Sequence, residues 1–492
     1  MQEKNKKFYI TTAIDYVNGK PHIGHALEKI QADVLARYHR AKGEDVWFLT
    51  GTDEHGVKIA RAAESVNNDP KEFVDKTSQE FRKLKAVLNL SWDDFIRTSD
   101  QERHWPGVQK LWRKLAEEGK LYKKSYRGLY CVGHEAFVTE KDLVDGKCRD
   151  HRKEPEVVEE ENYFFKLSDY GDEIGKKIES GELAIIPDSR KNEILSLIRT
   201  GLEDISFSRP ARDLAWGIPV PDDPEHTMYV WCDALTNYIS AIGYGRDEKN
   251  FENWWGSEEV VHVIGKDILR FHAAIWPGML LAAGIGLPKK IFVHGFITVE
   301  GQKMSKSIGN VTDPFELVDT YGTDPVRYYL LREIPSGEDG DFSQEKFEER
   351  YNGDLANGLG NLVARVTTLG EKVSPVPVMQ DNEDIAREIN RVRTATHAYI
   401  ESFRLNEALG VIWELIGYGD RFINATKPWT IKDDSSALQK IIGDVSLLID
   451  AIRELIEPFL PETAKKMKEQ INIDGDSIKI KRGNVLFPRL VG

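Results

Sequence analysis

The chain has 492 residues, 40% of them hydrophobic and 30% charged, which is the balance of an ordinary globular protein with more than one domain. Its formal net charge of −14 argues against binding nucleic acid by bulk electrostatics, although a local surface can still recognise RNA by shape and stacking. The three cysteines are too few for a disulfide framework and fit a reducing, cytoplasmic environment.

We expect no association with a membrane. Residues 1–7 are polar and charged, unlike a secretion signal. The most apolar stretch, residues 273–287, is interrupted by proline and glycine and falls short of the ~20 residues that span a bilayer, so it predicts a buried helix.

Strand-like and helix-like runs alternate over residues 1–118, which predicts one half of a Rossmann-like, open parallel α/β domain. Residues 119–224 differ in character and read as an inserted connective domain, and residues 225–325 resume the α/β pattern. Residues 326–350 are expected to be a linker region. Helical periodicity then predicts an all-α bundle over residues 351–492.

The expected elements place polar residues at strand ends. Strands are predicted at residues 8–14, 46–49, 228–231, 260–264 and 291–293, and a helix at residues 26–41. Ligands of such sheets bind at the carboxyl ends of the strands, where Tyr16 and Asp53 would lie.

Two short motifs carry the functional signal. Residues 22–25 read HIGH at the start of the first predicted helix, where unpaired N–H groups and the helix dipole favour a phosphate. Residues 303–307 read KMSKS and place two cations and two hydroxyls in a loop after a strand. Either motif by itself also suits a helix cap or a solvated loop, but together they would hold a triphosphate from two sides.

In these motifs the chain resembles the class I aminoacyl-tRNA synthetases, and its flanking sequences resemble the methionyl-tRNA synthetases. The segments concerned are residues 11–21, 51–56, 230–234, 293–296 and 427–429. One departure is Asp15, where that family more often has an apolar or aromatic residue or proline. The short insertion agrees, because synthetases for smaller aliphatic amino acids carry large editing domains to supplement the ~1–3 kcal/mol that one methylene provides.

The resemblance implies ATP-dependent attachment of methionine to a tRNA with a CAU anticodon, through methionyl-adenylate, with ATP and Mg²⁺ required. It implies the following roles. Catalysis falls to His22, His25, Lys303 and Lys306. ATP is bound by these four together with Gly24, Glu28, Gly265, Asp267, Ile268 and Ser305. Methionine is bound by Ala13, Ile14, Tyr16, Asp53, Trp231, Ala234, Tyr238, His294 and Ile297. The anticodon is read by Asn361, Arg365 and Trp429, and the linker at residues 326–350 contacts the tRNA stem.

Several of these residues also have plain structural interpretations. Asp53 and Asp267 suit turns or helix caps, the aromatics suit a core, and Asn361 with Arg365 suit a surface pair. The insertion contains two Cys-x2-His pairs, Cys131 with His134 and Cys148 with His151, whose spacing suits tetrahedral Zn²⁺. The alternative is a knuckle without metal.

Two rival functions remain at this point. A nucleotidyltransferase could share the HIGH phosphate site but is usually shorter and lacks a helical C-terminal third. A non-catalytic tRNA-binding paralogue would be expected to lose motif residues, whereas both motifs are intact. Because no dimerisation module follows Leu490, a monomer is expected.

Overall fold

The computed structural model describes residues 5–133, 136–138, 143–149, 152–257, 259–304, 309–379, 382–431 and 435–490. It divides into two compact units. Unit 1 comprises Met1–Pro21, His39–Lys85 and Ser91–Val293, and unit 2 comprises His22–Tyr38, Ala86–Leu90 and His294–Gly492.

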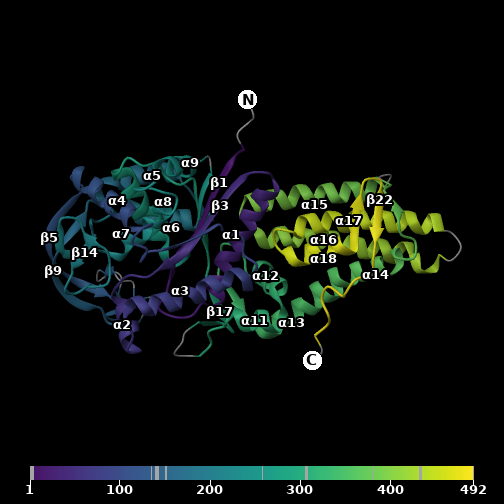
Figure 1. The fold of residues 1–492 in the computed structure, drawn as a ribbon, viewed down its shortest axis with the longest axis horizontal. Helices are drawn as coiled ribbons and strands as arrows, with labels where there is room; N and C mark the ends of the chain where they lie inside the picture. The colour runs from purple at the N-terminus through teal and green to yellow at the C-terminus, as the bar shows by residue number, and fades with distance from the viewer. Residues whose placement is uncertain are drawn as a thin grey trace. The chain divides into compact units, whose positions relative to one another are not determined.

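Unit 1 is built on a seven-stranded sheet in the order β10-β16-β15-β1-β3-β2, with β4 also paired to β3. The strands are β1 (Lys7–Thr12), β2 (Asp15–Tyr16), β3 (Asp45–Asp53), β4 (Asp94–Arg97), β10 (Ala184–Ile186), β15 (Glu259–Gly265) and β16 (Lys290–His294). β1 runs parallel to both β15 and β3, and its apolar residues are buried on both faces. Figure 1 shows β1 and β3 side by side. The predicted strands at residues 8–14, 46–49, 260–264 and 291–293 are therefore confirmed.

Helices connect and cover these strands. They are α2 (Val57–Ser65), α3 (Pro70–Val87), α4 (Trp105–Glu117), α5 (Gly171–Ser180), α6 (Asp188–Arg199), α7 (Val230–Leu235), α8 (Asn237–Ser240), α9 (Glu248–Trp255) and α10 (Trp276–Ala282), with the turns η2 (Leu167–Tyr170), η3 (Lys266–Ile268) and η4 (Phe271–Ile275). The apolar stretch from residue 273 forms η4 and α10, both buried as expected. Within the described residues, no helix combines the length and the apolarity needed to cross a membrane.

The predicted insertion is rich in antiparallel strands. They are β5 (Leu121–Cys131), β6 (Ala136–Val138), β7 (Leu143–Val144), β8 (Lys147–Cys148), β9 (Glu156–Phe165), β11 (Ile205–Ser206), β12 (Ser208–Pro210), β13 (Pro219–Val220) and β14 (Asp223–Met228). β5 pairs with β9 along nearly its whole length (Figure 1). The prediction of a parallel strand at residues 228–231 is wrong, because Met228 ends the antiparallel β14 and helix α7 starts at Val230.

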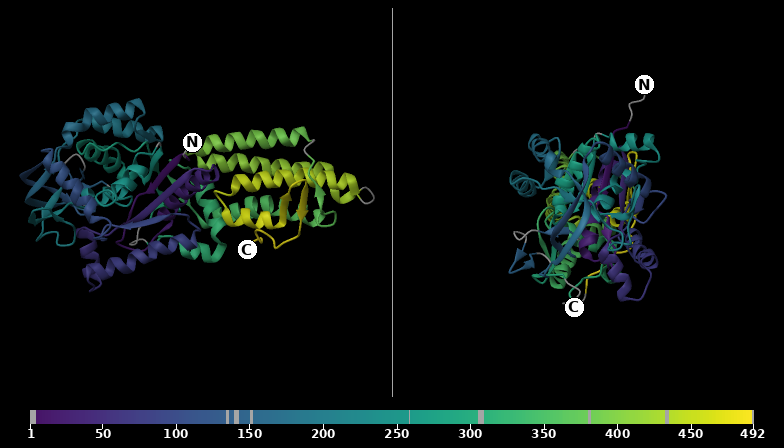
Figure 2. Two further views of the ribbon diagram at one scale, coloured as in Figure 1. Left: turned by 45° about the horizontal axis from the view of Figure 1, so that its top comes forward. Right: turned by 90° about the vertical axis from the view of Figure 1, so that its left-hand side faces the viewer.

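Unit 2 contains most of α1 (Ile23–Ala41) and the C-terminal helices. These are α11 (Pro314–Tyr321), α12 (Thr323–Arg332), α13 (Gln344–Arg350), η5 (Tyr351–Gly360), α14 (Asn361–Gly370), α15 (Glu383–Glu401), α16 (Leu405–Thr426), η6 (Pro428–Thr430), α17 (Ser435–Ile456) and α18 (Pro461–Gln470). α15, α16 and α17 lie side by side in a bundle (Figures 1 and 2).

The C-terminal region is helical as predicted, but it is not all-α. A three-stranded antiparallel sheet, β20 (Val376–Pro377), β21 (Ile471–Asp474) and β22 (Ser477–Ile480), accompanies the bundle. Its apolar residues Val376, Ile478 and Ile480 are buried, and Ile480 packs so closely on α14 that a methyl group at Gly370 would lie 2.6 Å from its Cδ1. Strands this short give almost no periodic signal in the sequence.

Candidate active site

The HIGH motif occupies the beginning of α1, as predicted. The main-chain N–H of His22 donates to Nδ1 of His25 at 3.1 Å, and the N–H of Gly24 donates to Nδ1 of His22 at 3.1 Å. The two rings stack with centroids 3.8 Å apart. Because both Nδ1 atoms accept hydrogen bonds, each neutral imidazole carries its proton on Nε2.

Gly24 is required by this arrangement of the histidines. A side chain there would place its first carbon 2.9 Å from Cε1 of His22 and 3.8 Å from Cε of Met304. The first distance is too short for a carbon–carbon contact, so any other residue would displace the His22 ring. The second distance places Met304 of the KMSKS motif beside the HIGH motif, within unit 2.

The KMSKS loop follows a hairpin of β17 (Ile297–Val299) and β18 (Gln302–Lys303). Glu300 and Gly301 form its turn, both with positive φ, as a tight two-residue hairpin requires. Beyond the loop, the carbonyl of Thr312 accepts the N–H of Ile23 at 3.2 Å, which anchors this segment to the start of α1. Lys303 is exposed on β18, and Ser305 and Lys306 lie outside the described residues.

Glu28 lies one turn after His25 on α1 and is buried. Its Oε2 lies 3.1 Å from Nε2 of His294, whose Nδ1 donates to the carbonyl of Gly295 at 2.8 Å. His294 and Ile297 belong to unit 2 together with the HIGH motif, whereas the other residues expected to bind methionine belong to unit 1. His294 is therefore a direct neighbour of an expected ATP-binding residue.

Unit 1 brings together several aromatic residues expected to line the methionine pocket. The half-buried Trp231 stacks on Phe271 with centroids 3.6 Å apart. Tyr238 is 1% exposed and its hydroxyl lies 2.7 Å from Nε2 of His272. The same helix-and-turn region contains Ala234, which is buried. Between β1 and β2 lie Ala13 and Ile14, and Tyr16 ends β2. The Tyr16 hydroxyl donates to the carbonyl of His55.

Sequence reasoning missed the histidines beside Tyr238. Burial lowers the pKa of His272 to about 4, despite a hydrogen bond from its Nδ1–H to the carbonyl of Ile268. His272 is thus neutral near pH 7 and accepts the Tyr238 hydroxyl on Nε2. Burial also lowers the pKa of His262, whose ring stacks on Tyr238. Single histidines in apolar runs gave no sequence signal for these contacts, which join distant segments.

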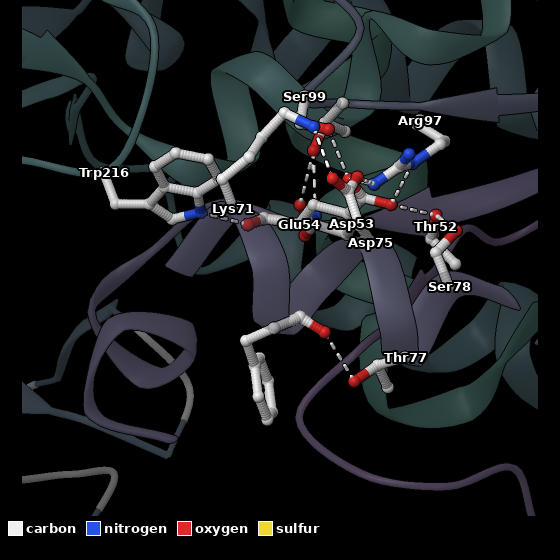
Figure 3. A network of polar contacts seen from close by, with 12 residues as sticks. Thr52, Asp53, Glu54, Lys71, Asp75, Thr77, Ser78, Arg97, Ser99 and Trp216 are labelled. Atoms are coloured by element: carbon white, nitrogen blue, oxygen red, sulfur yellow. Dashed lines mark hydrogen bonds and ion pairs between the residues drawn. The ribbon is translucent and has the colours of Figure 1, made fainter. Parts of the chain in front are cut away.

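Asp53 ends β3 and is 6% exposed. The hydroxyl of Thr98 donates to its Oδ1 at 3.5 Å and accepts the N–H of the following residue, Glu54, at 2.8 Å. Figure 3 shows Asp53 beside Glu54, Arg97 and Ser99 in a dense polar network. The predicted position of Asp53 at the carboxyl end of a parallel strand is confirmed.

A buried carboxylate links the Asp53 loop to α7. Oδ2 of Asp233 lies 2.6 Å from Nδ1 of His55, and Oδ1 lies 2.7 Å from Nε2 of His104, whose Nδ1 contacts Ser240. Burial would raise the pKa of Asp233, but the charge of His55 and the hydrogen bonds from both imidazoles lower it overall. Asp233 lies in the VWCDA segment, where a charge among apolar residues is a usable signal that sequence reasoning did not take up.

The carboxyl end of β15 carries the residues expected near a nucleotide, Gly265, Asp267 and Ile268. Gly265 ends the strand and is buried, while Asp267 is exposed in the turn η3. An exposed carboxylate at such an edge is accessible to ribose hydroxyls.

The two cysteines of the expected zinc knuckle lie together in the inserted domain. Cys131 ends β5 and Cys148 ends β8, and both are buried in one small cluster with Val138. Their expected partners His134 and His151 lie outside the described residues. Among the residues that are described, no group of three or more His, Cys, Asp or Glu side chains is arranged to hold a metal ion.

The expected anticodon residues meet on unit 2. Asn361 begins α14 on its exposed face, and Arg365 follows one turn later. The Arg365 guanidinium lies 5.3 Å from the ring centroid of Trp429 and donates to Oδ1 of Asn424 at 2.7 Å. Trp429 is 48% exposed, because Lys427 adopts a left-handed conformation (φ 46°) that ends α16 and directs the chain into η6. An exposed aromatic ring offers a face on which an unpaired base can stack.

The chain is similar to known aminoacyl-tRNA synthetases along nearly its whole length. A family model described as tRNA synthetases class I (M) matches residues 8–154 and 138–367. A methionine–tRNA ligase of Caldanaerobacter subterraneus subsp. tengcongensis is 45% identical, over 99% of this chain and 79% of the relative. The corresponding ligase of Brucella suis biovar 1 is 41% identical, over 99% of this chain and 95% of the relative.

Solved structures agree as well. The methionyl-tRNA synthetase of Mycobacterium tuberculosis in complex with methionyl-adenylate superimposes with a TM-score of 0.93 at 36% identity, covering 98% of this chain and 100% of that one. Its apo form superimposes with a TM-score of 0.87. The chain therefore belongs to the class I aminoacyl-tRNA synthetases, in the methionyl-tRNA synthetase family.

Proposed function

We propose that this protein joins methionine to tRNA in two steps, through methionyl-adenylate. The observation that carries the proposal is the meeting of the HIGH and KMSKS motifs at the start of α1, in a chain that matches methionine–tRNA ligases over nearly its whole length. In the first step, a methionine carboxylate oxygen attacks the α-phosphorus of ATP, and the bond to pyrophosphate breaks. In the second, a hydroxyl at the 3′ end of the tRNA attacks the carbonyl carbon, and AMP leaves.

The first step needs positioning and charge stabilisation rather than a general base, because the attacking carboxylate is already ionised. His22 and His25 donate from Nε2 to the phosphates of ATP, which is bound as its magnesium salt. Lys303, Ser305 and Lys306 stabilise the negative charge that develops on pyrophosphate. Gly24 and Glu28 border the nucleotide, and Gly265, Asp267 and Ile268 hold the adenosine.

Methionine binds through its ammonium group to Asp53 and through its thioether to the aromatic group of unit 1. A thioether packs favourably against aromatic rings. Because His272, which contacts the Tyr238 hydroxyl, is neutral, it adds no charge that would favour a polar substrate side chain. The pocket therefore comprises Tyr16, Trp231, Ala234, Tyr238 and the adjoining Phe271 and His272, with Ala13 and Ile14 at its edge. His294 and Ile297 complete the residues proposed to bind methionine, and within unit 2 His294 lies 3.1 Å from Glu28.

The helical region reads the anticodon of the tRNA. One base of the CAU anticodon leaves the stack of its neighbours and stacks on the ring of Trp429, while Asn361 and Arg365 hydrogen-bond to base edges.

The protein acts as a monomer. Cys131 and Cys148 would hold a structural zinc ion with His134 and His151, and their burial in one cluster suits two thiolate ligands. Such an ion would supply folding stability to the inserted domain.

Methionine-dependent exchange between ATP and labelled pyrophosphate tests the proposal. We expect exchange with methionine, and aminoacylation of a tRNA carrying CAU. A nucleotidyltransferase with another acceptor would exchange pyrophosphate without methionine. A non-catalytic tRNA-binding paralogue would bind tRNA and show no exchange. Either result would overturn the proposed function.

A further inference from the structure

Glu54 is a second carboxylate directly beside Asp53, and it is completely buried. Arg97, at the end of β4, donates from Nε to Oε1 of Glu54 at 2.7 Å and from a terminal nitrogen to Oε2 at 2.8 Å (Figure 3). This is the two-pronged geometry in which guanidinium and carboxylate bind most strongly. The negative charge of Glu54 is therefore neutralised within the protein.

Every other polar group of Glu54 is also held. Thr52 donates to Oε1 at 2.6 Å, and Ser99 donates to Oε2. The N–H of Glu54 is bound by Thr98, and its carbonyl accepts the indole N–H of Trp216 at 2.5 Å. Since the peptide units on either side of residue 54 are fixed, the backbone that carries Asp53 has little freedom to move.

The same Thr98 hydroxyl that accepts the Glu54 N–H donates to the Asp53 carboxylate. His55, the next residue, is fixed through Asp233 on α7. Asp53 is thus followed directly by two anchored residues, Glu54, which is tied to β4, and His55, which is tied to the helix that carries Trp231 and Ala234.

We propose that the Glu54–Arg97 ion pair positions Asp53 for the α-ammonium group of methionine. Because the two charges neutralise each other, the Glu54 carboxylate does not compete with Asp53 for the ammonium group. For the same reason, the Arg97 guanidinium does not compete with methionine for Asp53. Glu54 and Arg97 are positioning residues, and the inference rests on the proposed role of Asp53. If Glu54 loses its charge, Arg97 loses its two-pronged partner and keeps Asp75. The carboxylate of Asp53, the residue next to Glu54, then becomes a further anion that the guanidinium can bind. Methionine would then have to displace Arg97 in order to bind.

Arg97 also provides a matched control. It contacts Asp75 of α3 at 2.5 Å, and Asp75 in turn pairs with Lys71 at 2.6 Å. The Asp75 side chain is 41% exposed, against 0% for Glu54. Asp75→Asn therefore removes a carboxylate from the same guanidinium without touching the loop of Asp53.

The experiment compares full-length wild-type protein with Glu54→Gln, Arg97→Lys, Asp75→Asn and Asp53→Ala. Calorimetry gives the Kd for methionine, and pyrophosphate exchange gives kcat and the KM for ATP. The inhibition constant of 4-(methylsulfanyl)butanoate, which is methionine without its amino group, reports binding that does not involve the ammonium site. Arg97→Lys retains a cation beside Glu54, so it should fold even if Glu54→Gln does not.

Loss of a charge-assisted hydrogen bond at a buried site typically corresponds to a change of about tenfold to a hundredfold in affinity. We expect Glu54→Gln to raise the methionine Kd by at least about tenfold and Arg97→Lys to raise it in the same direction by less. The KM for ATP, the inhibition constant of the analogue and all values for Asp75→Asn should stay within about twofold of wild type. A general loss of structure would instead weaken methionine and the analogue together.

The outcomes separate this inference from the proposed function. Absence of methionine-dependent exchange in the wild type would overturn the function itself. If Asp53→Ala binds methionine normally, the ammonium assignment is wrong and the positioning role falls with it. If Asp53→Ala binds poorly while folded Glu54→Gln or Arg97→Lys binds like the wild type, the ion pair does not position Asp53.

Discussion

Replacing Arg327 should loosen the attachment of α1 to the rest of unit 2. Arg327 lies on α12, is 0% exposed, and pairs with Asp33 of α1 at 2.8 Å, which is equally buried. The same nitrogen, Nη2, also donates to the main-chain carbonyl of Pro458, and Nε and Nη1 donate to the carbonyls of Phe459 and Leu88. One guanidinium therefore joins α1 to two segments far away in the chain.

The expected cost follows from these partners. Breaking a buried ion pair by removing one member typically costs about 3–5 kcal/mol, because the remaining charge is left in the interior. A buried carbonyl that loses its donor adds about 1–3 kcal/mol, although neighbouring losses are not additive. Arg37 also binds Asp33 at 2.8 Å. Asp33 therefore keeps one cationic partner in the variant, which reduces the cost of breaking the ion pair. We therefore expect Arg327→Met to destabilise the contact by at least about 4 kcal/mol.

Hydrogen exchange read by mass spectrometry can measure this locally, which suits a chain whose parts need not unfold together. Peptides from α1 and α12 should lose protection in Arg327→Met, and pyrophosphate exchange should slow because α1 carries His22 and His25. Arg37→Met is the control, since Arg37 is 23% exposed and its loss should cost about 1 kcal/mol. Protection of α1 within about 1 kcal/mol of wild type in Arg327→Met would refute the reasoning.

Other outcomes follow from the site residues. Lys306→Ala should raise the barrier to adenylate formation by about 2.7–4 kcal/mol with methionine affinity unchanged, and a normal single-turnover rate would exclude Lys306 from the reaction. Trp429→Ala should weaken tRNA charging by about 1–3 kcal/mol and leave pyrophosphate exchange intact, whereas a parallel fall in both would contradict a separate anticodon site. Burial lowers the pKa of His272 from 6.5 to about 4, so its stabilising effect is complete above pH 6.5 and is lost as the pH falls toward 4. Between pH 6.5 and pH 4, the free energy of unfolding of His272→Phe should therefore fall by roughly 3 kcal/mol less than that of the wild type. The same fall in both proteins would count against a neutral His272. Finally, atomic emission should find zinc in the wild type and none in Cys148→Ser, and a metal-free wild type would show that the knuckle holds no zinc.

Short-range patterns in the sequence are enough to predict several elements of the fold and the position of one motif. The apolar runs predicted β1, β3, β15 and β16, since a strand buried on both faces needs a continuous apolar segment. The HIGH motif marked the start of α1, because its residues suit a helix N-terminus that binds an anion. The alternation of these elements identified the parallel α/β sheet, and the two motifs together pointed to the family.

Contacts between side chains that are distant in the sequence depend on the tertiary structure. Glu54 and Arg97 are 43 positions apart, and His55 and Asp233 are 178 apart, so no local periodicity connects them. His272 lies beside Tyr238, whereas His294, the histidine expected to bind methionine, lies beside Glu28 in unit 2. A pairing of this kind depends on strand order and on how helices pack over the sheet. The buried charges then select their partners, because a charge without one would be too costly in the interior.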